Sequence, residues 1–208
     1  MAILEAKNEE IIKKLNKLEE EKIKLKNKIT NSLFNENPSK IVTGEEEINF
    51  VKEIFENKKF NLLYRATIDG DAFTTFHSKC DDKGTTLSLF KTDKNRKWGA
   101  YSEYPWNSSN GCDPYKNNSN SKYFLINISD KKKYLPKKNH TRFNGGHSNV
   151  WFCDTMGISS NSILSIDGGT ENKGINSLYE NYVKEYEITG GNKFTCVELE
   201  VYQVETIS

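Results

Sequence analysis

The first 34 residues carry apolar side chains with a period of seven, which is the repeat of a coiled coil. We assign the residues at exact seven-residue spacing to d positions, which places two apolar residues at a positions. The apolar seam then consists of Leu4, Ile11, Leu18 and Leu25 at d, with Leu15 and Ile29 at a. Two further a positions hold the polar residues Asn8 and Lys22, which weaken the seam and can fix its register. Because a lone helix of this kind is marginal in water, we expect a parallel homodimer in preference to an antiparallel or larger assembly. The alternatives are a helix packed against its own domain and a solvated arm.

Charged residues beside the seam agree with a parallel dimer whose helices are in register. In that arrangement each g position faces the e position five residues further along the partner helix. Lys14 then faces Glu19, and Glu21 faces Lys26, so both pairs have opposite sign. The flanks of the helix therefore favour the same pairing as its seam.

Residues 35–42 are expected to form a hinge, because Pro38 cannot continue a helix. The next residues have the form of a capping box, with Thr43 as the N-cap and Glu46 reaching back to it. They open a second helix, which has an apolar stripe made of Ile48, Val51, Ile54 and Phe55. This helix is expected to cover a sheet in a domain that spans residues 43–208.

Beyond residue 60 the pattern changes to short apolar runs separated by polar or glycine-rich turns. Residues 61–92 predict a strand, a short helix with Phe73, Phe76 and Cys80 at helical spacing, and a second strand. Further strands are expected at 98–106, 123–128, 162–166 and 194–204, with a polar loop at 107–121. Alternation along the last strand places one set of side chains on a common face: Phe194, Cys196, Glu198, Glu200 and Tyr202.

Many short strands with helices early in the chain predict an α+β fold that is mainly β. We expect a two-sheet antiparallel β-sandwich flanked by short helices and preceded by the long coiled-coil helix. The chain then divides into a coiled-coil helix at 1–34, a hinge at 35–42 and a sandwich domain at 43–208.

Composition excludes several classes of function. With a net charge of +1 over 208 residues, no global charge favours nucleic acid or an anionic membrane. No apolar run approaches the roughly 18 residues that a membrane-spanning helix needs, and the start lacks the apolar core of a signal peptide. We therefore expect a cytoplasmic protein with reduced cysteines. No cofactor is expected, because the chain has no P-loop, dinucleotide fingerprint or HExxH motif.

His77 and Cys80 are the candidates for redox or nucleophilic chemistry. They lie three residues apart on the predicted short helix and so share a face. An imidazolium beside a thiol lowers the thiol pKa and produces a nucleophilic thiolate. The alternative is a small core cysteine beside a hydrogen-bonded histidine, since no third, orienting group can be named. A zinc site with distant residues is weaker still, because no CxxC spacing exists; those residues are Cys112, His140, His147 and Cys153.

Two charged clusters are candidates for interaction. Glu198 and Glu200 point to the same side of one strand, where they could bind a cation, perform acid–base chemistry or pair with Lys or Arg. Lys132 and Lys133 belong to a basic segment that could meet an acidic partner or lipid head groups. The alternative for the lysines is a solvated loop.

Five segments resemble, in order, those of the TLDc domain family. They are LLYRA at 62–66, FHSKCDDKGTTL at 76–87, GAYSEYPW at 99–106, FNGGHSNVWF at 143–152 and VELEVYQV at 197–204. The resemblance implies a β-sandwich flanked by short helices, without an established catalytic mechanism. It also implies a role in resistance to oxidative stress and in binding and regulating the vacuolar proton-pumping ATPase.

The leading hypothesis is thus a non-enzymatic protein-interaction module that is dimerised by its coiled coil. One alternative is a Cys80-dependent redox sensor or thiol enzyme. Another is a structural module that binds calcium or lipid through the acid pair or the lysines.

Overall fold

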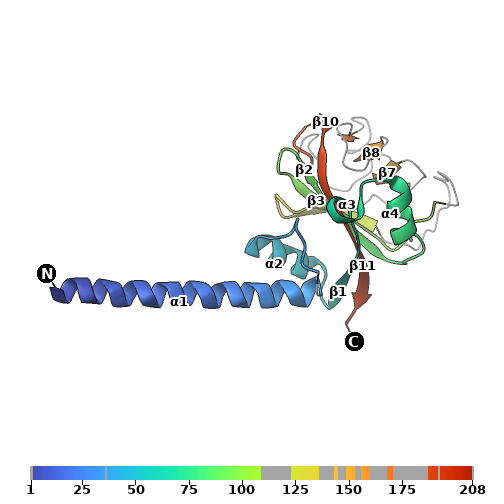
Figure 1. Cartoon of the computed structure of the whole chain (residues 1–208). Coiled ribbons are helices and arrows are strands. Elements are labelled where there is room, and N and C mark those ends of the chain that lie inside the picture. Colours follow the sequence, from blue (N-terminus) through green and yellow to red (C-terminus); the bar gives the residue numbers. More distant parts are fainter. Residues whose placement is uncertain are drawn as a thin grey trace.

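A computed structural model describes residues 2–35, 37–108, 123–135, 143–144, 149–152, 156–159, 168–170, 187–191 and 193–207. The helices are α1 (Ala2–Leu33), α2 (Glu45–Ile54), α3 (Ala66–Asp69) and α4 (Phe73–Cys80). The strands are β1 (Lys58–Arg65), β2 (Thr86–Thr92), β3 (Lys97–Ser102), β4 (Tyr123–Asn127), β5 (Lys132–Tyr134), β6 (Phe143–Asn144), β7 (Asn149–Phe152), β8 (Met156–Ser159), β9 (Gly168–Thr170), β10 (Lys193–Phe194) and β11 (Cys196–Thr206). Figure 1 shows α1 leaving the folded body as one long helix.

Some predicted features lie outside the described residues. They are most of the loop at 107–121, the strand at 162–166 and the zinc alternatives Cys112, His140, His147 and Cys153. The side chains of Leu4 and Ile29 are also outside the description.

The described strands form two antiparallel sheets. The larger sheet has the order β1-β11-β2-β3-β4-β5, so the last strand of the chain is inserted between two early ones. The second sheet has the order β10-β9-β8-β7-β6. The mixed helix-and-strand fold with an N-terminal helix is confirmed. Face-to-face packing of the two sheets as a sandwich stays a prediction.

The six-stranded sheet has a hydrophobic core on each face. Because side chains alternate along β2, Leu87 enters one core and Phe90 enters the other. Helix α2 contributes Ile48 and Val51 of its predicted stripe to the first core. Helix α4 contributes Phe76 to the second. Helix α2 therefore covers a sheet, as its apolar stripe predicts, and α4 packs on the opposite face of the same sheet.

Helix α2 begins one residue later than its sequence predicts. Its N-cap is Gly44, and the Glu47 carboxylate accepts hydrogen bonds from the N–H groups of Thr43 and Gly44, both at 3.0 Å. Glu46 forms an ion pair with Lys131 instead. The predicted capping box is therefore wrong by one residue, because three glutamates in a row follow Gly44 and each could have been the one that reaches back.

The final strand departs from simple alternation. A register shift between Cys196 and Glu198 marks a β-bulge, which places an extra residue in one strand. As a result, Cys196 lies in the same core as Leu199, although the pattern put them on opposite faces. The predicted strand at 194–204 is also divided, since Phe194 belongs to β10 in the second sheet.

The C-terminal end of α1 is anchored in the first core. Leu33 and Phe34 are buried, and the Phe34 ring centroid lies 5.4 Å from that of Phe60 and 5.1 Å from that of Tyr202. The segment predicted as a hinge continues into the same region, with three buried residues: Ser39, Ile41 and Val42. It is therefore a packed segment of the domain and not an exposed linker.

Phe34→Ala is expected to lower the free energy of unfolding by about 3–5 kcal/mol, because it leaves a cavity among packed rings. Chemical denaturation followed by tryptophan fluorescence measures the change. Phe50→Ala is the matched control, since Phe50 is only partly buried against the same core. Equal losses for the two variants would contradict an anchored end of α1.

Candidate functional site

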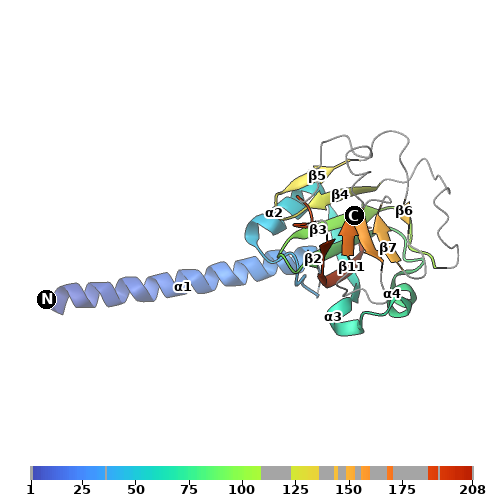
Figure 2. The same cartoon turned by 90° about the horizontal axis from the view of Figure 1, so that it is seen from above.

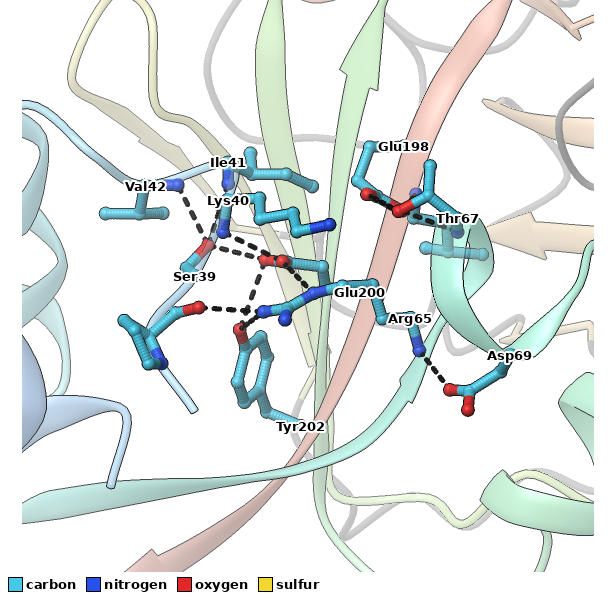
Figure 3. Close-up of polar contacts among 12 residues, drawn as sticks. Ser39, Lys40, Ile41, Val42, Arg65, Thr67, Asp69, Glu198, Glu200 and Tyr202 are labelled. Carbon is cyan, nitrogen blue, oxygen red and sulfur yellow. Dashed lines mark hydrogen bonds and ion pairs between the residues drawn. The ribbon is translucent and has the colours of Figure 1, made fainter. Parts of the chain in front are cut away.

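Glu200 lies in β11 with none of its surface exposed, and its carboxylate is the centre of a buried polar cluster. Arg65, at the end of β1, donates from Nε to Glu200 Oε1 at 2.7 Å. Tyr202 donates its hydroxyl to Glu200 Oε2 at 3.2 Å, and Ser39 donates its hydroxyl to the same oxygen. Figure 3 shows these side chains converging from three segments. We call Ser39, Arg65, Glu200 and Tyr202 the Glu200 cluster.

The electrostatics of the Glu200 cluster keep Arg65 charged and Tyr202 protonated. Although burial alone would lower it, the nearby carboxylate of Glu200 raises the pKa of the Arg65 guanidinium. Burial raises the pKa of the Tyr202 hydroxyl far above its ordinary value, so this group remains a hydrogen-bond donor. Two buried charges that satisfy one another avoid the large penalty of an unpaired charge.

The Glu200 cluster also binds the backbone that follows α1. The N–H of Lys40 donates to Glu200 Oε1 at 2.9 Å. The carbonyl of Pro38 accepts from Arg65 Nη2 at 2.8 Å. Ser39 Oγ accepts from the N–H groups of Ile41 at 3.0 Å and Val42 at 2.9 Å. Glu200 and Arg65 thus bind residues 38–40, and Ser39 in turn shapes the backbone of the next two residues (Figure 3).

Glu198 is engaged in a separate contact. Its carboxylate accepts hydrogen bonds from the Thr67 hydroxyl and from the Thr67 N–H, which lies 3.2 Å from Oε1. Thr67 belongs to α3, the single turn of helix after β1. In the same turn, Asp69 accepts the N–H of Arg65 at 2.8 Å. Glu198 therefore ties α3 to the sheet.

Glu198 and Glu200 are consequently not a surface that a partner could touch, because they are 6% and 0% exposed. The sequence correctly placed both on one side of a strand, and pairing with arginine was among the alternatives considered. It did not identify Ser39 or Tyr202 as members of the site. Tyr202 was on the predicted face of β11, but nothing in the sequence connects Ser39 with it.

His77 and Cys80 lie on α4, and both are buried. His77 Nδ1 is 2.8 Å from Asp81 Oδ1, so the orienting group that the sequence did not reveal is the next carboxylate along the chain. Although burial opposes the change, hydrogen bonds from His77 and Ser108 lower the pKa of Asp81. Asp81 therefore links α4 to Ser108, whose N–H donates to Asp81 Oδ2 at 2.8 Å.

Cys80 has the environment of an unreactive thiol. None of its surface is exposed, and burial, assisted by the neighbouring Asp81 carboxylate, raises its thiol pKa far above the ordinary value. Burial likewise raises the pKa of Cys196 to about 12. Because the thiolate is the reactive form, the burial of Cys80 and its raised thiol pKa count against this residue as a nucleophile or a rapid redox sensor.

The described part of the predicted basic segment contains a strand, where a solvated loop was the alternative. Lys132 and Lys133 lie in β5, at one edge of the six-stranded sheet. The ammonium groups of the segment have partners within the chain: Lys131 pairs with Glu46, Lys132 pairs with Glu187, and Lys133 Nζ lies 4.0 Å from the centroid of the Phe124 ring. These internal contacts reduce the charge that the segment offers to a lipid surface.

An open groove of about 680 Å³ separates α2 from the basic segment. Phe50 and Ile54 line it on the α2 side, while Lys131 and Lys133 line it on the other. Among the described residues, no three His, Cys, Asp or Glu side chains converge as a metal site would require. No described helix combines the length and apolar character of a membrane span.

Exposed large hydrophobic side chains of the described residues gather on α1. All side chains from residue 7 to residue 25 are exposed. Ile11, Leu15, Leu18 and Leu25 retain between 54% and 63% of their accessible surface. Figures 1 and 2 both show this stretch extending away from the sheets. The alternative of a helix packed flat against its own domain is therefore wrong.

A comparison with protein-family models matches residues 35–205 to the TLDc domain. The chain belongs to the TLDc domain family. The match begins two residues after α1 ends, so the packed segment at 37–42 falls within the TLDc domain and α1 is an addition to it. A search of curated proteins gives no match. The TLDc family is associated with protection against oxidative stress and is generally regarded as non-enzymatic.

Cys80 and Cys196 are expected to react with iodoacetamide more slowly than in the unfolded chain, by more than about tenfold, because their thiols are buried and protonated. Peptide mapping by mass spectrometry gives the rate at each cysteine, and the urea-unfolded chain is the reference. Rapid labelling of Cys80 in the folded chain, lost in His77→Gln, would revive the thiol-enzyme hypothesis.

Proposed function

We propose that this TLDc protein is a non-enzymatic interaction module, held as a parallel dimer by α1, which presents its TLDc domain to a protein partner. The exposed seam of α1 is the observation that carries the proposal. In the part of the chain that the structure describes, no other element covers Ile11, Leu15, Leu18 or Leu25. A second copy of the same helix would cover them, because each seam residue would pack into a hole on the partner.

The energy available from such a pairing is substantial. Complete burial of a Leu or Ile side chain contributes about 1.5–3 kcal/mol, and each dimer would bury the seam twice. Association costs an estimated 4–15 kcal/mol in lost translational and rotational freedom. The four described seam residues of each copy supply enough to offset most or all of that cost. The opposite charges of Lys14 with Glu19 and of Glu21 with Lys26 favour the parallel alignment.

We infer that the protein partner is the vacuolar proton-pumping ATPase, the partner implied by membership of the TLDc family, and that binding takes place in the cytoplasm. The two-sheet sandwich of the family would supply the scaffold for the contact. Two features of the described chain support protein binding over catalysis. The ionisable pairs at His77 and Glu200 are committed to internal contacts, and the groove beside α2 is open and partly apolar.

Replacing Leu18 and Leu25 together by Gln is expected to convert the dimer into a monomer, because the substitutions make two d positions of the seam polar. Sedimentation equilibrium measures the mass. Ile23→Gln is the matched control: Ile23 is equally exposed at 57% but lies at a b position, away from the seam. A wild-type monomer, or an unchanged mass in the double variant, would contradict the proposed dimer.

Binding to the ATPase is tested with vacuolar membrane vesicles that contain the enzyme. The wild-type chain is expected to co-sediment with them and to change the rate of ATP-driven acidification. Vesicles made from the extracted lipids alone are the control. Equal sedimentation with both preparations would indicate lipid binding, and the absence of sedimentation with either would exclude this partner.

A further inference from the structure

We propose that the Glu200 cluster is a clasp that fixes the direction in which α1 leaves the TLDc domain and can open without unfolding the domain. The proposed dimer pairs α1 with the α1 of a second copy. Whether α1 moves relative to its own domain is a separate question. The contacts of residues 38–42 address that question.

The backbone after α1 is joined to the sheet by side chains of the Glu200 cluster. The N–H of Lys40 donates to Glu200 at 2.9 Å, and the Ser39 hydroxyl donates to the same carboxylate. Within the segment, the N–H groups of Ile41 and Val42 donate to Ser39 Oγ at 3.0 and 2.9 Å. The carbonyl of Pro38 is held by Arg65 from the opposite side. The hydrogen bonds that join this segment to the sheet therefore come from side chains and not from pairing as a strand, and they act together with the burial of Ile41 and Val42 in the first core.

The Glu200 cluster also contacts the residue that follows α1. Tyr202 belongs to the cluster, and its ring lies 5.1 Å from that of Phe34, measured between ring centroids. Tyr202 therefore links the end of α1 to the carboxylate that binds the segment after it. A closed clasp would hold the end of α1 in place on the six-stranded sheet.

Ser39 can be changed without leaving a buried charge unpaired. Its hydroxyl donates to Glu200 and accepts from Ile41 and Val42. The Arg65–Glu200 ion pair, at 2.7 Å, lies wholly within the sheet between β1 and β11. Removing the hydroxyl of Ser39 thus takes away three hydrogen bonds, weakens the attachment of the segment and leaves the ion pair in place.

Trypsin provides a direct probe, because Lys40 lies inside the clasped segment and its side chain is exposed. Cleavage after Lys40 requires the segment to leave the sheet. In Ser39→Ala we expect this cleavage to be faster by about tenfold or more, because several hydrogen bonds are lost together. Cleavage after Lys91 in β2, which requires the sheet itself to open, should keep its wild-type rate. N-terminal sequencing identifies the fragment that begins at Ile41.

Two further variants make the outcome specific. Glu200→Gln should accelerate cleavage after Lys40 more than Ser39→Ala does, since it also weakens the bonds to Lys40 and Arg65. Asp130→Asn is the control, because it breaks an ion pair with Arg96 that lies outside the Glu200 cluster. Its rate of cleavage after Lys40 should match the wild type.

The clasp is overturned if the wild type is cleaved after Lys40 as fast as Ser39→Ala, or if Ser39→Ala accelerates cleavage after Lys40 and Lys91 equally. All variants are also measured with Leu18 and Leu25 replaced by Gln. A clasp that persists in this background stands even if no dimer forms, so its failure and that of the proposed dimer are distinguishable.

Discussion

A carboxylate without exposed surface must be paired, and in this TLDc domain that requirement fixes how three distant segments meet. Glu200 lies on β11, inside the six-stranded sheet, where an unpaired charge would be strongly destabilising. Arg65 satisfies it from β1 and Ser39 from the segment after α1, across 135 and 161 positions of sequence. The pairing of the first and last strands and the attachment of the long helix therefore share one electrostatic centre.

Local sequence patterns predicted the helices that are defined by a regular spacing of apolar residues. The heptad gave the helix that became α1, and the stripe of Ile48 and Val51 gave the helix over the first core. The errors have equally local causes. Three adjacent glutamates made the start of α2 ambiguous by one residue, and the bulge beside Cys196 reversed the side that this residue faces. Alternation has a period of two, so a single inserted residue exchanges the faces.

The Glu200 cluster was beyond such patterns for a different reason. Alternation along a strand predicts that a polar residue faces solvent. Its burial avoids a large energetic cost only when a residue from elsewhere in the fold pairs with it. Arg65 and Tyr202 each lie in a predicted apolar strand, so either residue could have been suspected as a buried partner of Glu200. Ser39 could not, because a serine after a proline gives no sign of a partner in the last strand. Asp81 could not be recognised either, because its role depends on the burial of His77.

The attachment of α1 determines what dimerisation would achieve. Two domains joined through flexible hinges sample many separations, so that a second binding event gains from proximity over a broad range of partner geometries. Two domains joined rigidly gain only where the spacing and orientation of the partner's sites match their own, and there the gain is larger because less freedom is lost. The contacts of Phe34 and of the Glu200 cluster would place a dimer of this TLDc chain in the second regime. The dimer would then select partners by the arrangement of their sites as well as by the chemistry of each contact.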